Sequence, residues 1–218
     1  MTKDEGILVF GAGGHAHVIL DLLAELKIPV AGIVNQGGVP TEKIANILHY
    51  VSDDNWTSLP QRRGIVAIGD NNIRAKVVAK IQGQAPDFEF LTLIHPRAIV
   101  SRSARICLGS VVMAGVVVNA GSQVGEHCIL NTSCSVDHDC NIQNFASINP
   151  GAVLGGNVDV GSRSAIGLGA SVIHGIQIGY DTVIGAGAVV VKNIEQSVLA
   201  YGNPCEVVRS RTRDESYL

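Results

Sequence analysis

The second half of the chain repeats with a period of six residues. A helix would place apolar residues three and four apart and an ordinary strand would alternate them, so neither explains the pattern. A six-residue repeat is typical of a parallel β-helix, in which each hexapeptide forms one short strand and one corner. We expect about five triangular coils of three hexapeptides, with residues 18 apart stacked at roughly 4.8 Å. An aliphatic residue stands at every sixth position: Val100, Ile106, Val112, Val118, Val124, Leu130, Val136, Ile142, Ile148, Leu154, Val160, Ile166, Val172, Ile178, Ile184 and Val190.

The corners and outer positions of the repeat have patterns of their own. Outer positions include apolar residues such as Val111, Val117 and Ile173, which a single copy of the chain would leave in water, so we expect a trimer. Glycine and asparagine are expected at corners because they tolerate positive φ. The corner candidates are Gly125, Gly155, Gly161, Gly167, Gly179, Gly185, Asn131, Asn149 and Asn157.

The N-terminal part predicts alternating strands and helices. An apolar strand is expected over Ile7–Phe10, followed by the glycine turn from Gly11 to Ala16 and a helix with apolar residues at helical spacing. Two further buried strands are expected over 30–34 and 64–68. Mixed helix and strand patterns give way to the six-residue repeat near residue 95. We therefore predict a Rossmann-like α/β domain over 1–95 and a β-helix domain over 96–218.

A ligand site is expected where these parallel strands end. The glycine turn lets a ligand approach the backbone, and the following helix N-terminus favours phosphates. Gly11-x-Gly13-x-x-Ala16 nearly matches a dinucleotide fingerprint, but Asn35 stands where NAD needs an acidic residue. A nucleotide-linked small molecule, NAD and a purely structural turn therefore stay open. The polar residues at this edge are His15, Asn35, Gln36, Asp70, Asn71, Asn72 and Arg74; His15 could bind ligand or backbone, and the last four could cap a helix or touch ligand.

Composition argues against several classes of function. Charged residues make up 16% of the chain, the formal net charge is -3, and no run of Lys or Arg could neutralise a phosphate backbone. A nucleic-acid partner is therefore not expected. The first residues lack the pattern of a leader peptide and no stretch of 18 apolar residues occurs, so we expect a cytoplasmic protein that does not enter membranes.

The cysteines are interpreted as small buried side chains. Cys128, Cys134 and Cys140 are six residues apart because they occupy the small position of successive hexapeptides. We therefore expect neither a metal site nor a disulfide, and no covalent nucleophile, since the cysteines fall on inward positions.

His138 is the candidate general base. It stands between Asp137 and Asp139, two positions after an inward valine, and a carboxylate can orient an imidazole and make it more basic. A solvated histidine on a prism face is the alternative. His174, 36 residues further on, is the rival candidate, and His127 is interpreted as a surface residue.

The chain resembles the bacterial sugar acyltransferases of the left-handed β-helix class. These include acetyl-CoA-dependent N-acetyltransferases of nucleotide-linked 4-amino sugars and sialic acid O-acetyltransferases. The similar segments are Gly11-Ala-Gly-Gly-His15, the repeat block, Asn131-Thr132, Asp137-His138-Asp139, Pro150-Gly-Ala-Val153 and Gly202-Asn-Pro204. The resemblance implies a homotrimer with acetyl-CoA between neighbouring subunits and no metal.

The resemblance also implies roles for individual residues. His138 would be the catalytic base and Asp139 the carboxylate that makes it more basic. Ser147 stands where relatives usually carry a second histidine, and its hydroxyl can donate one hydrogen bond toward the thioester. The residues expected to bind acetyl-CoA are Ser147, Gly156, Leu168, Ala186 and Pro204. Those expected to bind the nucleotide sugar are Gly13, Gly14, His15, Asn35, Gln36 and Gly69.

The expected reaction is transfer of acetyl from acetyl-CoA to the 4-amino group of a UDP-linked sugar in bacterial glycan biosynthesis. His138 would take the proton directly, and a backbone N–H, such as that of Gly156, would stabilise the oxyanion. The alternatives are O-acetylation of sialic acid or another sugar, N-acetylation of a GDP-linked amino sugar, and a non-enzymatic trimer that binds a nucleotide sugar.

Overall fold

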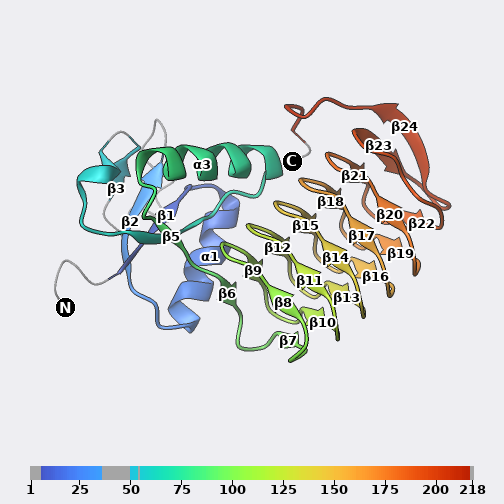
Figure 1. The fold of residues 1–218 in the computed structure, drawn as a ribbon, viewed down its shortest axis with the longest axis horizontal. Coiled ribbons are helices and arrows are strands. Elements are labelled where there is room, and N and C mark those ends of the chain that lie inside the picture. Colours follow the sequence, from blue (N-terminus) through green and yellow to red (C-terminus); the bar gives the residue numbers. More distant parts are fainter. Residues whose placement is uncertain (1–5, 36–49, 54, 217–218) are drawn as a thin grey trace. The chain divides into compact units, whose positions relative to one another are not determined.

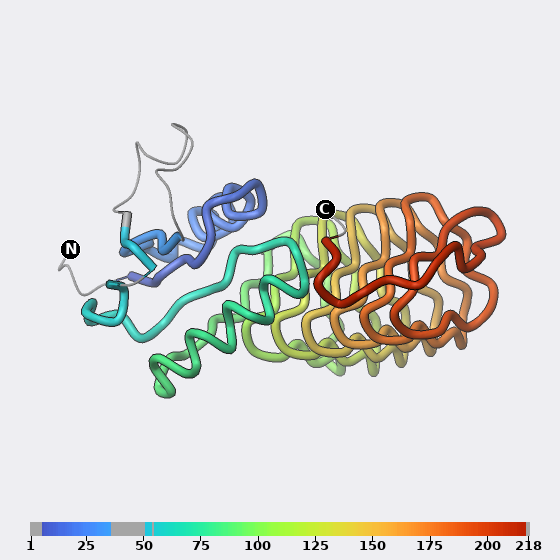
Figure 2. The backbone as a smooth tube through the Cα atoms, turned by 90° about the horizontal axis from the view of Figure 1, so that it is seen from above, coloured from blue at the N-terminus to red at the C-terminus, as the bar shows by residue number. Residues whose placement is uncertain are grey.

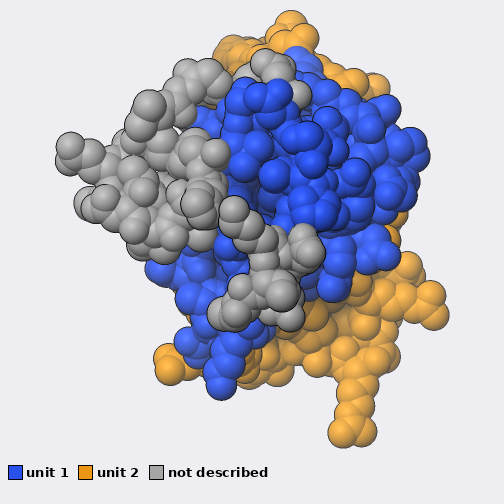
Figure 3. Space-filling view, turned by 90° about the vertical axis from the view of Figure 1, so that its left-hand side faces the viewer, with its two compact units in different colours: residues 1–93 blue, residues 94–218 orange. Residues whose placement is uncertain are grey.

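The computed structural model describes residues 6–35, 50–53 and 55–216. They form two compact units, residues 1–93 and residues 94–218, which Figure 3 distinguishes by colour.

The first unit is a parallel sheet with helices in its connections (Figure 1). Its strand order is β3-β2-β1-β4-β5, and each neighbouring pair is parallel. Because β1 lies between β2 and β4, the strand order reverses beside β1, where open α/β sheets bind ligands. The elements are β1 (Ile7–Phe10), α1 (Gly14–Glu25), β2 (Val30–Asn35), β3 (Tyr50–Ser52), the 3₁₀ turn η1 (Trp56–Ser58), β4 (Arg63–Val66), α3 (Asn71–Gln84) and β5 (Glu89–Phe90).

An aromatic cluster fills part of this unit's core. The ring of Phe10, at the end of β1, packs edge-on against Trp56 and Phe88, with centroids 5.1 and 5.5 Å apart. Ring pairs prefer such edge-to-face contacts. The cluster joins β1 to two segments far apart in the sequence, and the hydrophobic pattern alone did not indicate η1.

The second unit is the predicted parallel β-helix, whose coils follow one another in Figure 2. Its strands form three stacked faces, and partners are 18 residues apart, as in Val117 with Ser135. Face 1 comprises β7 (Ile99–Val100), β10 (Val117–Val118), β13 (Ser135–Val136), β16 (Val153–Leu154), β19 (Ser171–Val172) and β22 (Val189–Val190). Face 2 comprises β8 (Arg105–Ile106), β11 (Gln123–Val124), β14 (Asn141–Ile142), β17 (Asp159–Val160) and β20 (Gln177–Ile178).

Face 3 continues into the C-terminal hairpin. Its strands are β6 (Leu93–Ile94), β9 (Val111–Val112), β12 (Ile129–Leu130), β15 (Ser147–Ile148), β18 (Ala165–Ile166), β21 (Val183–Ile184), β23 (Val198–Tyr201) and β24 (Glu206–Ser210). β23 and β24 pair antiparallel. The chain passes from face 1 to face 2 to face 3 in every coil, so each face meets the next at a corner.

The six-residue pattern marks the interior as predicted. Every sixth residue from Val112 to Val190 is at most 3% exposed, whereas Val100 and Ile106 at the start of the repeat are half-buried. Branched side chains suit this pleated interior. Cys128, Cys134, Cys140 and Cys205 are buried, but Cys107 is exposed, so the expectation that all cysteines point inward was wrong for Cys107.

The expectation of positive φ was wrong for all six of the glycines named as corner candidates. Gly155 and Gly161 do not have positive φ; a Cβ on Gly161 would lie 2.4 Å from the backbone nitrogen of Tyr180 in the next coil. Glycine is needed there because successive coils approach closely. Asn131 and Asn149 also lack positive φ, whereas Asn157 has it, at 56°.

The outer apolar residues are not all exposed. Val111 on face 3 is 1% exposed within its own chain, so its use as evidence for association was wrong. Ile173 is 41% exposed and Val117 is half-buried. The most exposed apolar side chain of face 1 is Ile99, at 68%.

Candidate functional site

His138 and Asp139 form a hydrogen-bonded pair at the corner between β13 and β14. Nδ1 of His138 lies 2.9 Å from Oδ2 of Asp139, and both side chains are exposed. This hydrogen bond raises the pKa of His138, and the negative charges of Asp137 and Asp139 act in the same direction. Because the carboxylate holds Nδ1, Nε2 is the nitrogen that can accept a proton from a ligand.

Gly156 lies against the other side of the imidazole, one coil further on. A methyl group placed on Gly156 would lie 2.4 Å from Nε2 of His138. No described group accepts a hydrogen bond from the N–H of Gly156, whereas Oδ1 of Asp137 accepts the N–H of His138 at 2.8 Å. The residue before Gly156 is Gly155, which has no side chain to do the same. A free backbone donor therefore adjoins the candidate base.

The other two histidines of the repeat differ from His138. His174 is exposed at the same corner, two coils after His138, but no described carboxylate pairs with it. His127 is 3% exposed, so its interpretation as a surface residue was wrong. Its ring stacks on Phe145 with centroids 5.1 Å apart and planes at 9°, because the two residues are 18 apart on one corner.

The predicted acetyl-CoA residues lie on several parts of the prism. Leu168 and Ala186 are exposed at the corner between faces 3 and 1, one above the other, so with Gly156 they border face 1 from both sides. Pro204 is exposed between β23 and β24.

Ser147 is 2% exposed in β15 of face 3, opposite the corner that carries His138. One chain therefore does not bring Ser147 to His138.

The glycine turn of the first unit is open to a ligand. Gly13 and Gly14 have no atom within 4 Å of an added Cβ, and α1 begins without a side-chain cap. Nε2 of His15, in the first turn of α1, is buried and has no hydrogen-bond partner among the described residues. Burial, aided by the charge of Arg74, lowers the pKa of His15 to about 4, so the ring is neutral near pH 7.

Two other residues of the predicted nucleotide-sugar site lie at the ends of strands. Asn35 ends β2 and Gly69 follows β4, at the same edge of the sheet as the glycine turn. Gln36 lies outside the described residues.

Asp70 and Arg74 have hydrogen bonds that hold the start of α3 and the segment after β4. Oδ1 of Asp70 accepts the backbone N–H groups of Asn72 and Ile73 at 3.0 and 2.9 Å, so Asp70 caps α3. The buried guanidinium of Arg74 donates to the carbonyls of Ile68 and Gly69, both at 2.9 Å. Arg74 thus places a positive charge beside the glycine turn, which the sequence alone left undecided.

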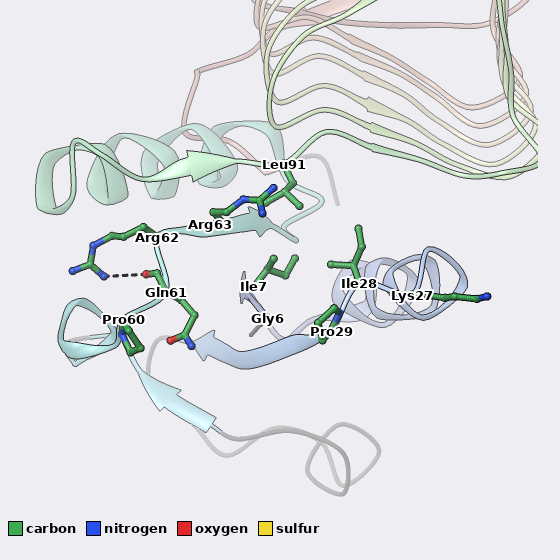
Figure 4. Close-up of a pocket in the computed structure, with 10 residues that line it drawn as sticks. All are labelled: Gly6, Ile7, Lys27, Ile28, Pro29, Pro60, Gln61, Arg62, Arg63 and Leu91. Carbon is green, nitrogen blue, oxygen red and sulfur yellow. Dashed lines mark hydrogen bonds between the residues drawn. The ribbon is translucent and has the colours of Figure 1, made fainter. Parts of the chain in front are cut away.

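A cavity of about 620 Å³ lies at the opposite edge of this sheet, near the start of β1 and β4 (Figure 4). Its two arginines are engaged: Arg62 pairs with Asp87 at 3.6 Å, and Arg63 with Glu89 at 3.4 Å. The cavity is lined by residues other than those of the glycine turn, so it is a separate site.

The parts of the chain that the structure describes contain neither a candidate metal site nor a candidate membrane span. No cluster of three His, Cys, Asp or Glu side chains there could hold a metal ion. Within those same residues, no helix has the length and apolar character to cross a membrane.

Comparison with known proteins finds a matching family model and a similar protein. The family model described as the PglD N-terminal domain matches residues 6–81. UDP-N-acetylbacillosamine N-acetyltransferase from Bacillus subtilis (strain 168) is 33% identical over 122 residues. That match spans 50% of this chain and about half, 52%, of the length of the Bacillus protein.

Solved structures match over nearly the whole chain. A mutant of GDP-perosamine N-acetyltransferase from Caulobacter crescentus, in complex with CoA and GDP-perosamine, is 38% identical with a TM-score of 0.87. The match covers 94% of this chain and 97% of that one. The acetyltransferase domain of PglB from Neisseria gonorrhoeae FA1090, in complex with acetyl coenzyme A, is 38% identical with a TM-score of 0.82, covering 94% and 99%. By identity and coverage together, the chain belongs to the family of sugar N-acetyltransferases that pair a PglD-type N-terminal domain with a parallel β-helix.

Proposed function

We propose that the protein transfers an acetyl group from acetyl-CoA to the 4-amino group of a nucleotide-linked sugar, with His138 as general base. The observation that carries this is the arrangement around one imidazole. Asp139 holds Nδ1, while Nε2 lies against Gly156, whose N–H has no acceptor among the described residues. A base and a donor for a developing oxyanion are the two groups that acyl transfer needs.

His138, Gly156 and Asp139 would each have a separate role in the reaction. Acetyl-CoA supplies the acetyl group on an electrophilic thioester carbonyl. Nε2 of His138 accepts the proton that the amine loses as its nitrogen bonds to that carbonyl carbon, and the imidazolium then returns a proton to the departing sulfur. The N–H of Gly156 donates to the carbonyl oxygen as it gains charge. Asp139 keeps the proton of the imidazole on Nδ1 throughout.

Direct transfer to the amine is favoured over a covalent acyl-enzyme. Cys140, the cysteine next in sequence to the pair, is buried, and burial raises the pKa of its thiol. The same effect raises the pKa of Cys134 to about 12. These thiols stay protonated near pH 7 and are poor nucleophiles.

The glycine turn of the first unit would bind the nucleotide sugar. The uncapped N-terminus of α1 presents backbone N–H groups to a diphosphate, next to the charge of Arg74. The neutral His15 can exchange a hydrogen bond with the sugar through Nε2. We propose a UDP-linked acceptor, after the Bacillus relative, and a GDP-linked acceptor as the second candidate, because the similar Caulobacter structure holds GDP-perosamine.

We also propose that the active form is a homotrimer with acetyl-CoA between copies. Exposed Leu168 and Ala186 border face 1, whose outer surface includes exposed Ile99 and Val153. A second prism against this face would cover the apolar side chains and form a groove along them. Ser147 lies on the opposite face and is buried there, so within one chain it does not reach the thioester beside His138.

The direct test supplies purified protein with acetyl-CoA and a panel of UDP- and GDP-linked sugars, and follows release of free thiol. We expect release with 4-amino sugars and none with the matching 4-hydroxy sugars or with sialic acid. Thiol release with hydroxyl acceptors alone would replace the proposal by O-acetylation. Binding of a nucleotide sugar without thiol release on any acceptor would favour the non-enzymatic alternative.

A further inference from the structure

The corner one coil before the His138–Asp139 pair lies directly against it. Val117 pairs with Ser135 and Gln123 with Asn141, so the residues between them stack in register. We call residues 119–122 the support corner and residues 137–140 the base corner. Each residue of the support corner makes a separate contribution to the base corner.

Asn119 fixes the start of the base corner through Asp137. Its side-chain amide donates to Oδ1 of Asp137 at 2.9 Å, and the same oxygen accepts the backbone N–H of His138 at 2.8 Å. These two hydrogen bonds lower the pKa of Asp137, so its carboxylate stays ionised near pH 7. The carboxylate is therefore held in place while it orients the peptide that carries the imidazole.

Ala120 and Ser122 hold the rest of the turn. The carbonyl of Ala120 accepts the N–H of Asp139 at 2.9 Å. The hydroxyl of Ser122 donates to the carbonyl of Asp137 at 2.5 Å and accepts the N–H of Cys140 at 3.1 Å. Ser110 makes the same two hydrogen bonds, to the carbonyl of Gly125 and the N–H of Cys128. This serine contact is therefore not confined to the base corner.

Gly121 supplies the space for the carboxylate of Asp139. A Cβ on Gly121 would lie 2.3 Å from Oδ1 of Asp139, while Oδ2 of that carboxylate holds Nδ1 of His138 at 2.9 Å. Any side chain at position 121 must therefore displace the carboxylate that the imidazole needs. The atom in the way ends a flexible side chain, so it can move with little effect on the fold.

We propose that Asn119 and Gly121 are positioning residues for His138, Asn119 by holding Asp137 and Gly121 by leaving room for Asp139. This inference rests on the proposed function of His138 as the base. It adds a requirement that lies one coil before the base, at positions 18 residues before Asp137 and Asp139. Neither residue need touch the substrates.

Gly121→Ala and Gly151→Ala form a matched pair for the test. Gly121 and Gly151 both have positive φ, at 75° and 68°, so alanine strains both backbones, but nothing lies within 4 Å of a Cβ on Gly151. We expect similar losses of thermal stability in the two variants. Only Gly121→Ala should lower kcat, by roughly tenfold to a hundredfold, and only it should lower the pKa of His138 in an NMR titration.

Equal kcat values, or an unchanged His138 titration in Gly121→Ala, would overturn the role of Gly121. The titration needs no substrate, so it separates this inference from the proposed function. If His138→Asn kept full activity, the proposed function would fail even where Gly121→Ala had moved the titration.

Asn119 has its own test and control. Asn119→Leu should lower kcat several-fold and leave KM for both substrates unchanged, whereas Asn149→Leu, at the same position of another hexapeptide, should leave both constants unchanged. Because Asn119 acts through Asp137, adding Asn119→Leu to Asp137→Asn should cost little more. Additive losses, or a change confined to KM, would overturn its role.

Discussion

At the scale of single residues, neighbours distinguish His138 from the other histidines of the repeat. Three histidines stand on corners between Val100 and Val190, but among the described residues only His138 of these three has a carboxylate on Nδ1 and a free backbone N–H beside Nε2. His127 is buried and stacks on Phe145, and His174 has no paired carboxylate among the described residues. The chemistry follows from what the adjacent coils place around an otherwise ordinary side chain.

Replacing His138 should remove the base and little else. We expect His138→Asn to lower kcat by about two to four decades, the usual contribution of general-base catalysis, with acetyl-CoA affinity nearly unchanged in calorimetry. His174→Asn, a similarly exposed histidine on the same corner, is the control and should keep nearly full activity. The reverse result would move the base to His174.

The dependence of kcat/KM on pH should show the effect of Asp139 on the base. His138 acts when unprotonated, so kcat/KM rises with pH through its pKa, which the hydrogen bond to Asp139 raises. In Asp139→Asn that pKa falls, so the rising limb should move to lower pH while the plateau drops. Asp159→Asn, on face 2, should leave the limb in place. A limb displaced to higher pH would contradict the assignment.

Ser147 should matter little to the rate. It is buried on face 3, so we expect its hydroxyl to contribute at most one ordinary hydrogen bond to the thioester. Ser147→Ala should therefore cost less than about tenfold in kcat/KM, or roughly 0.5–1.5 kcal/mol. A loss equal to that of His138→Asn would mean that Ser147 takes part in proton transfer.

At the scale of elements, glycine has two distinct uses in one hexapeptide. At Gly151 and Gly175 the backbone has positive φ and open space around the missing Cβ. At Gly161 and Gly179 the φ angle is ordinary, but the backbone of the next coil occupies the space of a side chain. The stacking distance between coils therefore limits composition at corners independently of the turn conformation.

These two uses predict different costs of alanine. In Gly161→Ala the new Cβ would lie 2.4 Å from the backbone nitrogen of Tyr180, so two coils must separate. We expect a loss of about 1–3 kcal/mol in the free energy of unfolding from this clash. Gly175→Ala, which meets no atom, should lose only the strain of positive φ, roughly 1–2 kcal/mol. Denaturant unfolding measures both, and a smaller loss for Gly161→Ala would contradict this reading.

At the scale of the whole molecule, the exposed apolar side chains predict assembly. Ile99, Val153 and Leu168 are 68%, 47% and 59% exposed on face 1 and its corner. Face 2, by contrast, presents polar residues such as Gln123 and Asn141. We therefore expect light scattering to give about three times the chain mass of 22.8 kDa. Val153→Glu should dissociate the assembly and Gln123→Glu should not; a wild-type mass of one chain would exclude the trimer.

The sequence alone determined the β-helix and its interior. A period of six admits one regular structure, because an inward residue at every sixth position sets the strands, their register and the coil of 18. The sequence also indicated the strand, glycine turn and helix at the N-terminus, since an apolar strand run is followed by apolar residues at helical spacing. The pair His138 and Asp139 could be named because residues adjacent in sequence share a corner.

Only the tertiary structure decided what lies beside each side chain in the neighbouring coil. Gly156 and Gly121 are 18 residues from His138 and Asp139, and no local pattern marks a glycine as space for a side chain of another coil. Val111 and Ser147 on face 3 are likewise buried, although their outward-facing positions in the repeat predict exposure. Periodicity specifies the direction of a side chain, but burial and free donors depend on atoms that the chain brings together from distant positions.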